Sequence, residues 1–127
     1  TVERGRYLAN NVANCMACHS PLDLATGELN GPAFSGNAIG EPSMMDPSVM
    51  LRMPNLTPDP TGVLARFASE DAWIGRFRVG RVVEESSMPW GPYSRMGDED
   101  LRAIYRYLNS LDPVANDVGP TVERVGG

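Results

Sequence analysis

Two cysteines and one histidine stand within five residues near the start of the chain, in the order Cys15-Met16-Ala17-Cys18-His19. This C-x-x-C-H spacing allows two thiols and one imidazole to reach the same planar ring. Each thiol can add across a vinyl group of haem to form a thioether, and the imidazole can then bind the iron from one face. The pattern therefore predicts one covalent c-type haem, attached through Cys15 and Cys18, with His19 as an axial ligand.

Three other kinds of site use the same residues. A thioredoxin-like redox pair follows a buried strand, but no β-branched run precedes Cys15. A zinc site needs four ligands, and with only two Cys and one His in the chain two carboxylates would have to complete it. A disulfide across two intervening residues has poor geometry. Haem attachment is the hypothesis that uses every cysteine and histidine of the chain.

The composition indicates one loop-rich, acidic domain. Of 127 residues, 13 are glycine and 11 are proline, which predicts long irregular segments. A buried porphyrin would supply the apolar mass that such a chain has difficulty assembling. The net charge is −5 and all 11 basic residues are arginine. This balance does not favour nucleic-acid binding, and it is typical of a chain with a basic or mixed-charge protein partner.

Helical periodicity predicts helices over residues 2–14, 69–79 and 98–111. The last is the clearest, with apolar positions at i, i+3, i+4, i+7 and i+10. These positions are Leu101, Ile104, Tyr105, Leu108 and Leu111.

Four residues suggest how these helices begin, end and pack. Ser69 and Asp98 are expected N-caps, and Gly80 is an expected helix stop. Gly5, inside the first helix, suggests close approach by another helix, because glycine in a helix interior otherwise costs about 1 kcal/mol relative to alanine.

Residues 20–66 have no sustained period, and we expect loops there with a short helical turn over 47–52. No segment has the roughly 18 apolar residues of a membrane span. A signal peptide is absent from the sequence, and we expect Thr1 to be a mature or trimmed N-terminus.

In this setting, four ordered stretches make the chain resemble the monohaem class I cytochromes c. The stretches are RGRYLA at 4–9, NLTPDP at 55–60, MPW at 88–90 with Tyr93, and DEDL at 98–101. The chain looks most like the cytochrome c domains and subunits of bacterial alcohol, aldehyde and sugar-acid dehydrogenases. The resemblance implies an all-α class I cytochrome c fold with crossing N- and C-terminal helices. It also implies a cytochrome domain over 1–113, a surface tail over 114–127 and a periplasmic location.

Met88 is the expected second axial ligand of the iron. Because Pro89 follows it, the backbone of Met88 is biased toward an extended form that presents the thioether to a ring face, and the resemblance indicates the same residue. Met53, also followed by proline, is the alternative. The other methionines are expected to fill gaps in the core or, for Met16, to lie on the wrong side of the ring; they are Met16, Met44, Met45, Met50 and Met96. The chain has no second histidine, which excludes bis-histidine ligation and a second haem.

The resemblance implies five further haem contacts. Pro32 is expected beside His19, with its carbonyl accepting the imidazole N–H. Asn55 and Thr57 are expected near the haem propionates. Trp90 and Tyr93 are expected to touch the haem, with ordinary core packing as the alternative.

These features predict one-electron transfer, with electrons received from a dehydrogenase and passed to an oxidase or another cytochrome of the respiratory chain. No acid–base pair or nucleophile is expected, because the iron uses the only histidine. Two alternatives stay open: a haem protein with an open or labile sixth site that binds small ligands or performs redox catalysis, and a structural metal or disulfide module. We expect Arg76, Arg78 and Arg81 to form a solvated positive face, with a local positive patch for docking or for a haem propionate as the alternative.

Overall fold

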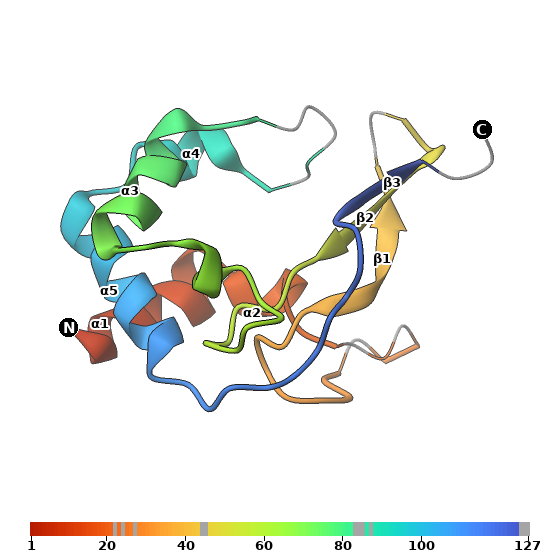
Figure 1. Cartoon of the computed structure of the whole chain (residues 1–127), viewed down its shortest axis with the longest axis horizontal. Coiled ribbons are helices and arrows are strands. Elements are labelled where there is room, and N and C mark those ends of the chain that lie inside the picture. Colours follow the sequence, from red (N-terminus) through yellow and green to blue (C-terminus); the bar gives the residue numbers. More distant parts are fainter. Residues whose placement is uncertain are drawn as a thin grey trace.

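The computed structural model describes residues 1–21, 23, 25–26, 28–43, 46–82, 86 and 88–124. The helices are α1 (Val2–Tyr7), η1 (Leu8–Val12), α2 (Cys15–Cys18), η2 (Leu64–Arg66), α3 (Glu70–Val79), α4 (Trp90–Ser94) and α5 (Asp98–Asn109). The strands are β1 (Asn37–Pro42), β2 (Val49–Met53) and β3 (Val122–Arg124). In Figure 1 the longer helices gather at one end, the sheet stands at the other, and α2 lies between them. No helix in this described part is long and apolar enough to cross a membrane.

Helices α1 and α5 pack against each other at Gly5. A Cβ atom on Gly5 would overlap the carbonyl oxygen of Ala103 and lie 2.7 Å from the Cβ of Tyr107. The absence of a side chain therefore allows the two backbones to touch, as the sequence suggested. Leu8 on η1 and Leu101 and Leu108 on α5 are almost fully buried around this crossing.

The ends of α3 and α5 follow from local hydrogen bonds. The hydroxyl of Ser69 accepts from the backbone N–H of Ala72 at 3.1 Å, so Ser69 is the predicted N-cap of α3. Gly80 ends that helix with φ +80°, a backbone conformation that glycine adopts without strain. The expectation for α5 was wrong by one residue, because Gly97 is the N-cap and Asp98 is the first helical residue.

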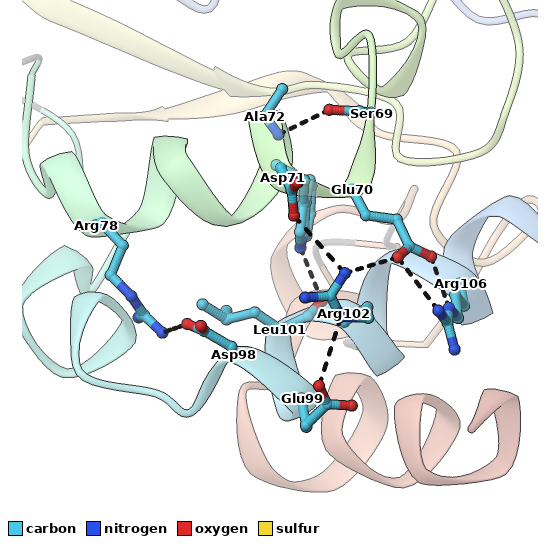
Figure 2. A network of polar contacts seen from close by, with 11 residues as sticks. Ser69, Glu70, Asp71, Ala72, Arg78, Asp98, Glu99, Leu101, Arg102 and Arg106 are labelled. Carbon is cyan, nitrogen blue, oxygen red and sulfur yellow. Dashed lines mark hydrogen bonds and ion pairs between the residues drawn. The ribbon is translucent and has the colours of Figure 1, made fainter.

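Charged residues join α3 to α5 along their exposed sides (Figure 2). Glu70 accepts from Arg106 Nε at 2.6 Å and from Arg102 at 3.0 Å. Arg78 pairs with Asp98 at the start of α5. Since each arginine on α5 reaches the same carboxylate of α3, the pairs fix the angle between the two helices.

A three-stranded antiparallel sheet corrects the expectation of an all-α fold. The strand order is β1-β2-β3, with Pro42 opposite Met50 and Val49 opposite Arg124. Residues 47–52, expected to form a helical turn, instead carry most of β2. Val49 and Leu51 are buried, so the alternate residues of β2 face the interior, as a half-buried strand requires.

The stretch expected to be a surface tail packs on the body as far as it is described. Its β3 pairs with β2, Val118 is buried, and the side-chain amide of Asn116 donates to the carbonyl of Ser35 at 2.7 Å. The domain boundary at residue 113 stays a prediction.

Candidate functional site

The helix type changes just before the two cysteines, which line the cavity described below. In η1 the backbone N–H of Ala13 donates to the carbonyl of Leu8 at 2.8 Å, a π-helical bond. Asn14 then takes a left-handed conformation with φ +57°, and the chain turns sharply into α2. Cys15 and Cys18 lie three residues apart on this single turn, so their thiols leave the same side of the helix.

The imidazole of His19 is held by the backbone of a distant segment. Its Nδ1 lies 2.8 Å from the carbonyl oxygen of Pro54, directly after β2. Burial lowers the pKa of His19, and the bond to Pro54 opposes that shift. A neutral ring that donates from Nδ1 leaves Nε2 as a free electron pair, the form that binds a metal.

Pro32 does not have the role expected of it. Its carbonyl accepts from the hydroxyl of Ser35 at 2.7 Å, and it stands apart from the cavity that His19 lines. The carbonyl expected from Pro32 beside the His19 imidazole is instead that of Pro54, which directly follows β2.

The two thiols are unpaired. Neither Cys15 nor Cys18 is in a disulfide. Burial raises the pKa of the Cys15 thiol to about 11. The pKa of the Cys18 thiol is also raised, mainly by burial and to a smaller extent by the negative charge of Glu41. Among the described residues no cluster of three or more His, Cys, Asp and Glu side chains could hold a metal ion, which gives the zinc alternative no support.

These residues line one cavity of about 480 Å³, within the size range of cofactor pockets. Six of the expected haem contacts are in its wall: Cys15, Cys18, His19, Met88, Trp90 and Tyr93. Leu56, Val63, Phe67, Trp73 and Phe77 add apolar surface. The wall is thus built from α2, the end of β2, η2, α3, the segment before α4, α4 itself and the start of β3.

Asn55 and Thr57, expected near propionates, are not in that wall. Both are almost fully buried, and the hydroxyl of Thr57 donates to Asn55 Oδ1 at 2.7 Å. Asn55 Nδ2 donates to the carbonyl of Val114 at 2.6 Å, and the N–H of Val114 donates back to Thr57 Oγ1 at 3.1 Å. Their polar groups therefore tie the 55–57 segment to the chain that follows α5.

Two methionines, Met88 and Met53, line the cavity. Met53 directly precedes Pro54, and Met88 comes from the connection between α3 and α4. Met96, expected to fill the core, packs against the hydrophobic core, as does Met16, which was expected on the wrong side of the ring. Met50 lies in β2. Met44 and Met45 fall outside the described residues.

The backbone of Met88 is tied on both sides. Its N–H donates to the hydroxyl of Ser86 at 3.3 Å, and its carbonyl accepts from the N–H of Trp90 at 2.8 Å. The indole Nε1 of Trp90 donates to the same Ser86 hydroxyl at 3.2 Å. The hydroxyl of Tyr93 donates to the carbonyl of Ala13, which joins α4 to the residues before the cysteines.

Three arginines line the cavity, Arg52, Arg66 and Arg76, whereas no carboxylate of the described residues does. The sequence did not indicate Arg52 or Arg66, and it indicated a propionate contact for Arg76 only as the alternative to a solvated face. Helix geometry could have placed Arg76 in the wall, because it lies three residues after Trp73 and beside Phe77 on the buried face of α3. Arg78 and Arg81, with which it was grouped, are exposed.

The site is thus a mostly apolar pocket lined by two thiols, an imidazole, thioethers and cations. No protein-family model matches the chain. The chain is 32% identical over 118 residues to the gluconate 2-dehydrogenase cytochrome c subunit of Pantoea cypripedii. It is 27% identical over 118 residues to the cytochrome c subunit of the quinone alcohol dehydrogenase of Gluconobacter oxydans, and 26% identical over 127 residues to the fructose dehydrogenase cytochrome subunit of Gluconobacter japonicus.

These similarities cover 90–94% of this chain but only 22–24% of each of these relatives. The chain is thus similar, over nearly all of its length, to the cytochrome c subunits of alcohol, gluconate and fructose dehydrogenases, as the sequence motifs suggested. It spans about a quarter of the length of the curated relatives it matches.

Proposed function

We propose that the chain carries single electrons through one c-type haem bound in this cavity. The observation that carries the proposal is the meeting of Cys15, Cys18, His19 and Met88 in the wall of one pocket. These are the two thiols and two axial ligands that a covalent His/Met haem needs. Homology to cytochrome c subunits of dehydrogenases supports the same function.

The residues present fit haem in three respects. The thiols leave one side of α2, as two thioether bonds to one ring edge require. Aromatic and aliphatic side chains make up most of the wall, which suits an apolar macrocycle. Haem carries two propionate carboxylates, and the arginines that line the cavity offer positive counter-charges to them. They do so in a chain whose net charge is −5.

In this proposal His19 binds the iron through Nε2, because Nδ1 is engaged by Pro54. The second ligand must then come from the wall that Nε2 faces. Met53 is bonded to Pro54 and so belongs to the segment behind the imidazole, whereas Met88 belongs to the connection between α3 and α4. We therefore assign Met88 as the second axial ligand.

Bound haem would supply the one-electron redox chemistry. Pro54 holds His19 in the ligating tautomer, and the aromatic side chains of Trp73 and Phe77 exclude water from the pocket. A methionine sulfur opposite the imidazole favours the reduced state and so raises the reduction potential. Cys18 is exposed, and this solvent-facing side of α2 is where electrons enter and leave.

We further propose that the donor is a dehydrogenase, and that the electrons then pass toward the respiratory chain. The chain itself is not the catalyst, because its one histidine is an iron ligand. We also propose a periplasmic location, as the resemblance of its motifs to cytochrome c domains of bacterial dehydrogenases implies.

Expression in a bacterial periplasm with the haem-attachment machinery, followed by a pyridine-haemochrome assay on denatured protein, tests the proposal. We expect one haem per chain that stays with the polypeptide after acid–acetone extraction. The Cys15→Ala/Cys18→Ala variant should lose it, and Ser20→Ala should keep it as a neighbouring control. A wild-type protein that carries no covalent haem contradicts the proposal.

A further inference from the structure

Arg76 is a cation that the cavity wall holds against an aromatic ring. Its guanidinium carbon lies 3.9 Å from the centroid of the Trp90 ring, and its Nη1 donates to the carbonyl of Gly80 at 2.7 Å. Burial lowers the pKa of Arg76, and no ion pair involves Arg76 in the described part of the chain. Its side chain is therefore fixed by the α3 terminus on one side and by Trp90 on the other.

Two consecutive residues of α3, Arg76 and Phe77, pack against the indole ring of Trp90. Phe77 packs on the indole with ring centroids 5.4 Å apart, and Arg76 stacks on it. Trp90 retains only 9% of its exposure. The position of the indole is thus set by α3 rather than by its own short helix.

The indole in turn fixes the backbone of Met88 through a serine. Trp90 Nε1 and the N–H of Met88 both donate to the hydroxyl of Ser86, at 3.2 and 3.3 Å. Movement of Trp90 would release one of the two bonds that hold this hydroxyl in place. A continuous set of contacts therefore runs from Arg76 through Trp90 and Ser86 to Met88.

We propose that Arg76 is a positioning residue for the sixth ligand: by stacking on Trp90 it keeps the Met88 thioether against the iron and limits access of outside ligands. This inference rests on the proposed haem site. It differs from an effect of charge alone, which the loss of an exposed arginine outside the cavity wall, such as Arg95, would share.

The test is the affinity of the ferric protein for imidazole, which binds only when Met88 has left the iron. If the fraction of molecules in which Met88 is off the iron rises, the apparent affinity for imidazole rises in proportion. For Arg76→Met we expect about five- to tenfold tighter imidazole binding, from the strength of a partly buried cation–π contact. Arg76→Lys should fall between wild type and Arg76→Met, because lysine keeps the charge but not the planar stack.

Arg95→Met is the control for the loss of one positive charge, because Arg95 is exposed and lies outside the cavity wall. We expect its imidazole affinity to stay within about twofold of wild type, inside the error of independent sites. Arg76→Met combined with Trp90→Phe should bind imidazole no more tightly than the stronger single variant, because both break the same set of contacts. Equal effects of Arg95→Met and Arg76→Met, or strict additivity with Trp90→Phe, overturn the positioning role.

A haemochrome assay on each variant separates this inference from the proposed function. Absence of covalent haem from the wild type removes both. Haem in every variant with unchanged imidazole affinity removes only the role of Arg76. If Arg76→Met does not fold, Arg76→Lys decides: an affinity equal to that of wild type overturns the proposal.

Discussion

The Nδ1 atom of His19 lies 2.8 Å from the carbonyl oxygen of Pro54, 35 residues further along the chain. The bond joins the end of the sheet to the residue that follows the two cysteines. It gives β2 a function in the site, because the strand determines where Pro54 meets the imidazole. The sheet therefore belongs to the framework of the cavity.

Replacement of Pro54 by glycine should loosen this contact. Glycine increases the conformational freedom of the segment by an amount worth about 1 kcal/mol, so we expect hydrogen exchange at the His19 ring N–H to accelerate about fivefold, measured by NMR on the reduced protein. Pro32→Gly is the control and should leave that exchange unchanged. Acceleration by Pro32→Gly alone would restore the original assignment to Pro32.

Gly5→Ala should destabilise the protein strongly. The added methyl group would overlap the carbonyl of Ala103 where α1 crosses α5, and overpacking of this kind costs about 1–3 kcal/mol. Gly75→Ala, in the middle of α3 with nothing within 4 Å of its added Cβ, should instead stabilise by about 0.5–1 kcal/mol. Urea unfolding measures both. Equal effects of the two substitutions would mean that the helices do not cross at Gly5.

The features that the sequence predicts well are local. Helices α3 and α5 repeat apolar residues at helical spacing, and the C-x-x-C-H motif lies within five consecutive residues. Helix α4 was missed because Gly91 and Pro92 interrupt any helical pattern there. Strand β1 was missed for a similar reason, since it contains Gly40 and Pro42.

The features that the sequence did not predict depend on distant partners. Strand β2 pairs with β1 and with β3, and β3 begins at Val122, 69 positions after Met53. The choice of Pro54 over Pro32 depends on how that sheet meets α2. The burial of Asn55 likewise depends on its bond to Val114, which no local pattern indicates.

The stability contributed by Glu70 should depend on pH in one direction. The hydrogen bonds from Arg106 and Arg102 lower the pKa of Glu70 to about 2, whereas an unfolded glutamate titrates near about 4.3. The contribution is therefore complete above the unfolded pKa and is lost as the pH falls toward 2.

We expect Glu70→Gln to be less stable than wild type at pH 7 in urea unfolding, and the difference to shrink as the pH is lowered from about 5 to about 2. Glu3→Gln is the control, because Glu3 has no ion pair among the described residues. A difference for Glu70→Gln that is independent of pH would refute the assigned pairing.

Tyr93→Phe removes the hydroxyl that donates to the carbonyl of Ala13. Burial, with the Cys15 and Cys18 charges, raises the pKa of Tyr93 to about 12, so this hydroxyl stays protonated as a donor below that pH. We expect a loss of about 1 kcal/mol in the free energy of unfolding. Tyr7→Phe is the matched control, since Tyr7 is exposed, and it should change stability by less than about 0.5 kcal/mol.

The most direct test of the site is the weak near-infrared absorption band of the ferric protein, which reports a methionine sulfur on the iron. We predict that the band is present in wild type, survives in Met53→Ala and disappears in Met88→Ala, with covalent haem retained in all three. A band that persists in Met88→Ala, or that is lost only in Met53→Ala, contradicts the assignment of Met88 opposite His19.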